Sequence, residues 1–253
     1  MDLGLAGRVY VVTGGSRGLG FATAAALVAD GARVVLCARD EERLVKAAAE
    51  LGGPDHALAI DGDLADPGLE TRLVAAAMAR YERFDGVLVS VGGPPGGAVS
   101  TTKDDAWRVS FESVFLGPLR IARAGAISLG EGGSILFVLS TSVRSPIEGL
   151  AVSNGLRPGL AMAAKTLADE LGPRGIRVNA VLPGRVDTDR VRELDAATGR
   201  PETVRRAHED RIPLRRYGRP EELGQVAAFL LSPAASYVSG TLVAVDGGML
   251  RAL

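Results

Sequence analysis

A short apolar run, a glycine-rich turn and an alanine-rich stretch follow one another near the start of this chain of 253 residues. The run is Val9–Val12, the turn Thr13–Gly20 reads Thr-Gly-Gly-Ser-Arg-Gly-Leu-Gly, and the stretch extends from Phe21 to Ala29. This order predicts a strand, a tight turn and a helix. Glycines in such a turn let the backbone approach a pyrophosphate, whose charge interacts favourably with free N–H groups and the helix dipole. The turn is therefore a candidate nucleotide-binding loop, although similar turns also occur as plain connections.

Short apolar runs alternate with longer helical patterns along the rest of the chain, which is typical of a parallel sheet covered on both faces. The expected strands are Val9–Val12, Arg33–Cys37, Ala57–Ile60, Gly86–Val89, Ser134–Leu139, Arg177–Val181 and Leu242–Val245. The expected helices are Leu19–Ala29, Glu41–Leu51, Gly68–Arg80, Lys103–Ser128, Leu156–Leu171 and Pro220–Leu231. We predict an α/β fold, a single Rossmann-type doubly wound domain over residues 1–253 with about seven parallel strands. The charged segment Asp187–Arg211 is expected to form two short helices outside the sheet.

Composition argues against several classes of function. The formal net charge is −1 and no basic stripe with interleaved aromatic residues appears, so nucleic acid is not an expected partner. Cys37 is the only cysteine, which rules out an intramolecular disulfide and leaves no zinc-ligand spacing. No apolar run approaches membrane-spanning length, and residues 1–8 lack an apolar signal core. We expect a cytoplasmic protein that binds neither a metal nor a membrane.

Five ordered motifs resemble the short-chain dehydrogenase/reductase superfamily over essentially the whole chain. They are the glycine-rich turn, Asp63-Leu64, Val181–Gly184 with Thr188, Tyr217–Glu222 and Val245–Gly248. The resemblance implies a bound dinucleotide that contacts Gly14, Ser16, Arg17, Gly18, Leu19, Gly20, Arg39, Asp63, Leu64, Ser90, Gly92, Arg157, Pro183, Gly184, Val186 and Thr188. It also implies a homotetramer or homodimer, built through the helices Lys103–Ser128 and Leu156–Leu171 and the C-terminal strand.

The end of the second expected strand bears on which dinucleotide binds. An acid there would accept hydrogen bonds from the ribose of NAD, whereas the 2′-phosphate of NADP is recognised by cations. The position is Ala38, Arg39 follows it, and Arg17 lies in the glycine-rich turn, so two guanidinium groups are available for a phosphate. NADP(H) is therefore favoured over NAD(H). The alternative is that Arg39 is solvated and that Asp40, a natural helix cap, turns towards the ribose.

The catalytic positions depart from the family pattern. Members of the family carry a Ser, a Tyr-x-x-x-Lys and an Asn; the tyrosine protonates the substrate oxygen, and the lysine binds the ribose and lowers the pKa of the phenol. By alignment, Ser153 and Arg157 stand at the Tyr and Lys positions and Val114 at the Asn position. No tyrosine occurs between Tyr81 and Tyr217, so no shift of register restores the motif.

The replacing residues form a pattern of their own. Ser153-Asn154 and Arg157, together with the loop 92–97, resemble a divergent branch labelled 3-oxoacyl-carrier-protein reductase-like. Ser153 and Asn154 could donate hydrogen bonds to a substrate oxygen, and Arg157 could stabilise an oxyanion. The alternative is that Ser153 and Asn154 only cap the start of a helix.

The family serine is retained at the end of the fifth expected strand. Either Ser142 or Ser140 occupies its position, because Ser140-Thr141-Ser142 ends that strand. We prefer Ser142, since Ser142-Val143 matches the usual Ser-Val pair.

The leading hypothesis is an NADP(H)-dependent oxidoreductase acting on a carbonyl or hydroxyl group of a small molecule, with acyl thioesters among the candidates. Ser142 and Ser153 would orient the oxygen, and Arg157 would hold the ribose. The runner-up is an NADP(H)-binding regulator or partner subunit without hydride transfer. A hydrolase or lyase ranks last, because neither histidine lies near a strand-end Ser motif. The segment Asp187–Arg211 is either a solvated helical face or a lid, and His208 within it is either solvated or a substitute acid.

Overall fold

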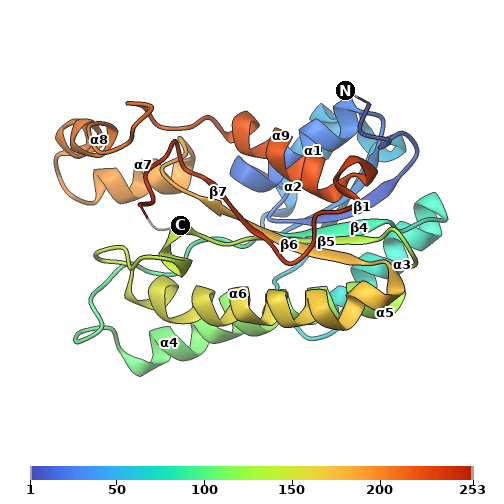
Figure 1. Ribbon diagram of the computed structural model, residues 1–253, viewed down its shortest axis with the longest axis horizontal. Coiled ribbons are helices and arrows are strands. Elements are labelled where there is room, and N and C mark those ends of the chain that lie inside the picture. Colours follow the sequence, from blue (N-terminus) through green and yellow to red (C-terminus); the bar gives the residue numbers. More distant parts are fainter. Residues whose placement is uncertain (1, 252–253) are drawn as a thin grey trace.

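One parallel sheet lies between two layers of helices in the computed structural model, which describes residues 2–251 (Figure 1). The order of strands is β3-β2-β1-β4-β5-β6-β7, and all neighbouring strands are parallel. The strands are β1 Val9–Thr13, β2 Arg33–Ala38, β3 Ala57–Asp61, β4 Gly86–Val89, β5 Ser134–Val138, β6 Arg177–Pro183 and β7 Leu242–Val245. The predicted fold class is confirmed.

Helices connect the strands on both faces of the sheet. They are α1 Gly18–Ala29, α2 Glu41–Glu50, α3 Leu69–Tyr81, α4 Asp104–Ser110, α5 Gly117–Ser128, α6 Ala151–Leu171, α7 Asp189–Ala196, α8 Pro201–Glu209 and α9 Pro220–Leu231. Helices α1, α2 and α9 cover one face, and α3, α5 and α6 cover the other (Figure 1). Within residues 2–251, we find no helix with the length and apolar character needed to cross a membrane.

Each face of the sheet has its own apolar core, because successive side chains of a strand point to opposite faces. Val9 and Val11 of β1 belong to the core under α3, α5 and α6, whereas Tyr10 and Val12 belong to the core under α1, α2 and α9. The continuous apolar runs at the centre of the sheet, β1, β4 and β5, therefore become strands that are buried on both faces, whereas the edge strands β3 and β7 are only partly buried.

Two helices differ from the expected boundaries. Helix α6 starts at Ala151 and not at Leu156, so Ser153 and Asn154 lie within its first turns and Leu150 is the N-cap. At Gly155 the ring of Trp107 approaches this helix closely, since a Cβ there would lie 2.8 Å from the ring. The predicted helix over Lys103–Ser128 is interrupted by a π-helical segment at Phe111–Leu116.

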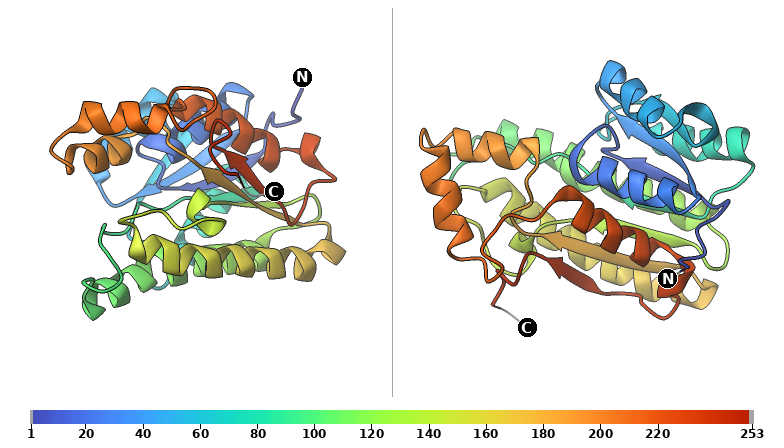
Figure 2. Two further views of the ribbon diagram at one scale, coloured as in Figure 1. Left: turned by 60° about the vertical axis from the view of Figure 1, so that its left-hand side comes forward. Right: turned by 90° about the horizontal axis from the view of Figure 1, so that it is seen from above.

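Helices α7 and α8 are the two short helices expected in the segment Asp187–Arg211. They lie together outside the three layers, at the end of the molecule where the parallel strands finish (Figure 2). This is the end at which ligands bind in open parallel sheets.

Candidate active site

The glycine-rich turn lies at the carboxyl end of β1, where the strand order reverses between β1 and β4. Gly14 and Gly18 have positive φ angles of 61° and 58°. Gly20 has no room for a side chain, because a Cβ there would overlap the carbonyl of Gly14. Helix α1 has neither a side-chain cap nor an acidic residue in its first turn. The turn therefore presents backbone N–H groups and a positive helix end, which suit a pyrophosphate.

The ends of β1 and β4 are joined beside this turn. Thr13 Oγ1 donates a hydrogen bond to the carbonyl of Ser90 at 2.7 Å and accepts one from the N–H of Ser90 at 2.8 Å. A Cβ on Gly14 would lie 3.0 Å from the Ser90 carbonyl oxygen. Gly14 and Ser90 are thus brought together as the motif predicts. Thr13 has a supporting role that the sequence analysis missed, although its place before the first glycine is a signal for it.

Arg17 and Arg39, the two arginines proposed to bind a phosphate, are exposed and form ion pairs with carboxylates. Arg17 is 3.1 Å from Asp189 at the start of α7, and Arg39 is 3.7 Å from Asp63. Such exposed ion pairs contribute little stability, so a phosphate can compete for both guanidinium groups. Asp40 caps α2 by accepting a hydrogen bond from the N–H of Arg43 at 3.0 Å, so its carboxylate is occupied at the start of this helix.

The remaining predicted cofactor residues lie along the same edge of the sheet. Thr188 caps α7 and lies next to the turn, since a Cβ on Gly18 would be 3.6 Å from its methyl group. Pro183 ends β6, and Val186 forms a bridge with Gly218. Leu19 and Leu64 pack against the two apolar cores; Ser16 lies within the turn, Gly92 just beyond Ser90, and Gly184 against Asp246 at the end of β7.

Two buried serine hydroxyls meet between β5 and α6. Ser142 Oγ lies 3.3 Å from Ser153 Oγ. Ser140 instead accepts a hydrogen bond from the N–H of Ser142 at 3.1 Å and so caps the 3-10 turn Thr141–Val143. The geometry therefore places Ser142, and not Ser140, against Ser153.

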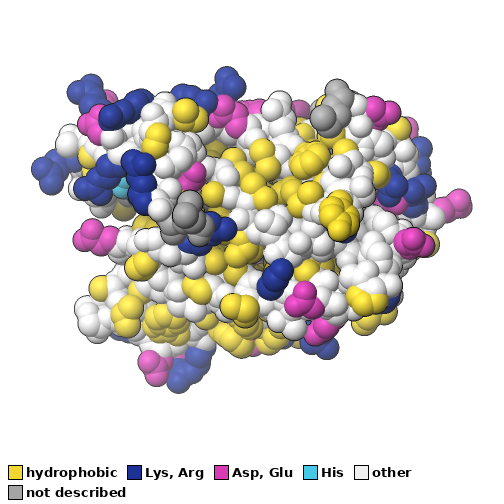
Figure 3. All heavy atoms as spheres, viewed as in Figure 1, with side chains coloured by type: hydrophobic (Ala, Val, Ile, Leu, Met, Phe, Trp, Pro, Cys, Tyr) yellow, Lys and Arg dark blue, Asp and Glu magenta, His cyan; other side chains and the backbone are white. Residues whose placement is uncertain are grey.

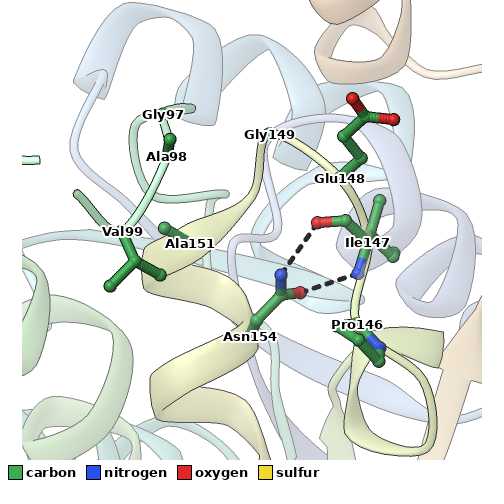
Figure 4. A pocket seen from close by; sticks show the side chains of 9 residues that line it. All are labelled: Gly97, Ala98, Val99, Pro146, Ile147, Glu148, Gly149, Ala151 and Asn154. Atoms are coloured by element: carbon green, nitrogen blue, oxygen red, sulfur yellow. Dashed lines mark hydrogen bonds between the residues drawn. The ribbon is translucent and has the colours of Figure 1, made fainter. Parts of the chain in front are cut away.

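Asn154 is bound to the neighbouring loop. Its Oδ1 accepts a hydrogen bond from the N–H of Ile147 at 3.0 Å, and its Nδ2 donates one to the Ile147 carbonyl at 2.8 Å (Figure 4). The same loop lines a cavity of about 340 Å³, which the side chain of Asn154 also borders. In this arrangement the side chain of Asn154 holds the loop in place, and its hydrogen bonds go to Ile147 and not to Ser142 or Ser153.

Arg157 lies one helical turn after Ser153 and is only 5% exposed. Its Nη1 donates to the carbonyl oxygens of Val138 and Leu139 at 3.1 and 3.2 Å, at the end of β5. Burial, together with the nearby charge of Arg190, lowers the pKa of Arg157 to about 10. The guanidinium therefore remains charged at neutral pH.

Arg190 is a residue that sequence reasoning missed. Its Nη2 donates to the carbonyl of Pro94 at 2.7 Å, which ties α7 to the loop after β4. A Cβ on Gly93 would lie 2.7 Å from Arg190 Nε, so the glycine makes room for the side chain. No local signal separates Arg190 from the many other arginines of its segment.

His208 lies against Tyr217, with 6.5 Å between the ring centroids. Burial, with a smaller contribution from Arg185, lowers the pKa of His208 below its ordinary value. The imidazole is therefore largely neutral at neutral pH, which weakens the case for a substitute acid.

Comparison with known proteins agrees with this geometry. Residues 14–250 match the family model described as enoyl-(acyl carrier protein) reductase. The protein named as ketoacyl reductase 1 of the granaticin polyketide synthase of Streptomyces violaceoruber is 35% identical and covers 95% of this chain and 92% of its own. Dehydrogenase/reductase SDR family member 4 of Homo sapiens is 33% identical, covering 96% and 88%. L-Sorbose reductase from Gluconobacter frateurii, complexed with NADPH and L-sorbose, superimposes with a TM-score of 0.92 at 30% identity and covers both chains completely.

The chain belongs to the short-chain dehydrogenase/reductase superfamily. It is an oxidoreductase of that superfamily.

This short-chain dehydrogenase/reductase has a group of buried polar side chains at the same edge of the sheet as the glycine-rich turn. The group contains the hydroxyls of Ser142 and Ser153, 3.3 Å apart, and the buried guanidinium of Arg157, four residues after Ser153 in α6. Hydroxyls donate and accept hydrogen bonds, and a guanidinium supplies positive charge without losing its proton. Such groups can orient a substrate oxygen and stabilise negative charge on it.

Proposed function

We propose that this short-chain dehydrogenase/reductase transfers hydride between NADP(H) and a carbonyl or alcohol group of a small molecule. The observation that carries the proposal is the 3.3 Å approach of Ser142 Oγ to Ser153 Oγ, in a buried position at the edge of the sheet that also carries the glycine-rich turn. The NADPH held by L-sorbose reductase supports the choice of cofactor.

The residues of the turn fit a dinucleotide, because they leave no side chain where a pyrophosphate would approach and leave the end of α1 uncapped. Arg17 and Arg39 would bind a 2′-phosphate by displacing Asp189 and Asp63, which favours NADP(H) over NAD(H). Arg157 would donate a hydrogen bond to the ribose. When bound, the nicotinamide supplies or accepts the hydride.

The serine pair would act on the substrate oxygen. Ser142 and Ser153 each have one O–H donor, and both can turn from one another towards a carbonyl oxygen. As charge develops on that oxygen, the positive end of α6 and the guanidinium of Arg157 stabilise it. Ser153 then passes its proton to the oxygen and takes another from water. Together, one hydride and one proton convert the carbonyl into an alcohol.

Oxidation of NADPH with a panel of ketones, aldehydes and acyl thioesters tests this function. Gly18→Asp should abolish turnover, because its carboxylate would repel the pyrophosphate. Gly7→Asp is the matched control, since Gly7 also has a positive φ, of 72°, and has open space around it. Ser153→Ala should lower kcat about a hundredfold, as loss of a hydrogen-bond donor to an oxyanion does, and leave the Kd for NADPH unchanged.

The runner-up is a protein that binds NADP(H) without hydride transfer. Val114 favours it, because a buried valine stands at the family Asn position. Absence of turnover across the panel, with NADPH binding intact, would contradict the oxidoreductase proposal and support this one.

We also propose that the protein forms a homodimer or homotetramer through α4, α5 and α6. Apolar side chains are exposed there, with Val109 at 69% and Met162 at 68%. Figure 3 shows hydrophobic side chains along the lower part of the view, over the region of α4 and α6. A surface hollow of about 470 Å³ is lined by Trp107, Phe111 and Leu156 together with Arg108 and Glu112.

A further inference from the structure

A buried positive charge in the active site has no carboxylate partner. Arg157 is 5% exposed, and among residues 2–251 no Asp or Glu forms an ion pair with it. Its two hydrogen bonds reach backbone carbonyls, through Nη1 alone. Burial of a charge without a counter-charge is strongly unfavourable. The N–H groups at Nε and Nη2 of Arg157 are free to donate hydrogen bonds to a ligand. A ribose hydroxyl could accept one of these bonds, but because it is neutral it would not compensate the positive charge of the guanidinium.

A second guanidinium adds to this charge. Arg190 reaches from α7 to the Pro94 carbonyl, and its proximity contributes to lowering the pKa of Arg157. The two like charges repel each other, so each disfavours the charged form of the other. The nearest carboxylate to Arg190 is that of Glu193, 3.9 Å away on the same helix and more than half exposed. An exposed contact of this length neutralises little of the charge.

The helix that carries Arg157 contributes to the same potential. The N-terminus of α6 has neither a side-chain cap nor an acidic residue in its first turn. Ser153 lies in that turn and meets Ser142. Glu148 precedes the helix, but its carboxylate points away from Asn154 (Figure 4). Arg157, one helical turn after Ser153, and the N-terminus of α6 therefore place positive potential beside the serine pair.

We propose that the substrate of this enzyme is a carbonyl compound that carries an anionic group, a carboxylate or a phosphate, and that this group binds Arg190 and Arg157. The inference rests on the proposed function, because it assigns the reacting carbonyl of the same substrate to Ser142 and Ser153. The two arginines come from different elements, α7 and α6. The anion would therefore also hold α7 and the loop containing Pro94 against the site.

Matched pairs of probes test the role of the charge. Acetoacetate is compared with methyl acetoacetate, and dihydroxyacetone phosphate with dihydroxyacetone, in reduction by NADPH. We expect the charged member of at least one pair to have the higher kcat/KM by about tenfold to a hundredfold, the range for hydrogen bonds to a charged group. The pair that shows the difference distinguishes a carboxylate from a phosphate.

Arg190→Gln keeps a donor for the Pro94 carbonyl and removes the charge. It should lower kcat/KM for the charged probe about tenfold or more relative to its effect on the neutral probe. Arg206→Gln is the matched control, because it removes an exposed charge from α8. Equal losses for both probes with Arg190→Gln, or a loss confined to NADPH affinity, would overturn the inference.

Calorimetric binding of acetoacetate and inorganic phosphate to the NADP⁺-saturated protein separates the two proposals. If these anions bind and Arg190→Gln weakens their binding, but no probe is reduced, the anion site is supported and the oxidoreductase function is contradicted. Turnover of neutral probes without any binding of these anions would retain the function and refute the anion site.

Discussion

Ser140 and Ser142, two residues apart just after β5, make different contacts. Ser140 caps a 3-10 turn, while Ser142 faces Ser153. Between them, Thr141 Oγ1 is the one buried side-chain nitrogen or oxygen atom in residues 2–251 that has no hydrogen-bond partner. An unsatisfied buried hydroxyl costs about 1–3 kcal/mol. Such a cost is tolerated most readily next to a functional site.

Cys37 gives a prediction about alkaline pH. The thiol is buried near the end of β2, and burial raises its pKa from 9.0 to about 12. Since the folded pKa exceeds the unfolded one, the neutral thiol stabilises the fold fully below about pH 9, and this contribution is lost as the pH rises towards 12. The free energy of unfolding, measured with urea, should therefore fall over this interval.

Cys37→Ala provides the comparison, because other groups also titrate at alkaline pH. The variant should lose less stability than the wild type over the same interval, whatever its stability at neutral pH. Equal slopes for the two proteins would refute the assignment. The native thiol should also react with a disulfide reagent far more slowly than the thiol of the urea-unfolded chain.

A buried polar network fastens the α7–α8 segment to the rest of the fold. Tyr217 donates a hydrogen bond from its hydroxyl to Asp195 Oδ2 at 2.9 Å, and Arg185 donates to Asp195 Oδ1 at 3.1 Å. Arg205 of α8 stacks on the ring of Tyr217, 4.5 Å from its centroid. These contacts join α7 and α8 to the stretch that leads into α9, so the segment has a defined position despite its polar composition.

Tyr217→Phe should loosen this segment. Asp195 would keep its bond from Arg185 and lose the one from the tyrosine, at a cost of about 1–3 kcal/mol. We expect limited proteolysis to cleave residues 187–211 faster in the variant. Tyr81→Phe is the control, because Tyr81 also donates a hydrogen bond, to the Pro54 carbonyl at 3.0 Å, but lies in α3. Equal cleavage rates within 187–211 for the two variants would count against an anchoring role.

The three-layer arrangement leaves large apolar side chains exposed on the side formed by α4, α5 and α6. The α4–α6 side exposes Val109 and Met162, whereas the cores on both faces of the sheet are well buried. Exposed apolar surface of this kind favours association.

Met162→Glu should therefore lower the molar mass that light scattering measures at a given protein concentration. A buried glutamate on each copy would be desolvated at the interface, which is strongly unfavourable. Val45→Glu is the control, since Val45 is 53% exposed on α2, which packs on the opposite face of the sheet. A monomeric wild-type protein, or the same mass for both variants, would contradict association through α4–α6.

The element order was predictable because its signals are local. Strands buried on both faces require uninterrupted Val, Ile and Leu, and the turn before α1 requires glycine at positive φ, so both appear directly in the sequence. The start of α6 was not predictable from local signals, because the helix has neither a side-chain cap nor an acidic residue in its first turn.

The pattern of the chain alone was sufficient to predict the fold class. The candidate cofactor residues followed from the resemblance to the family and stay predictions, as does the replacement of the usual tyrosine. Only the tertiary structure decides that Ser142 and not Ser140 meets Ser153, that Asn154 binds Ile147 and that Arg190 reaches the carbonyl of Pro94. These relations join residues from different elements, and their distances depend on how the elements pack. Backbone propensity acts over a few neighbouring residues, whereas the chemistry of this site depends on contacts between side chains that only packing brings together.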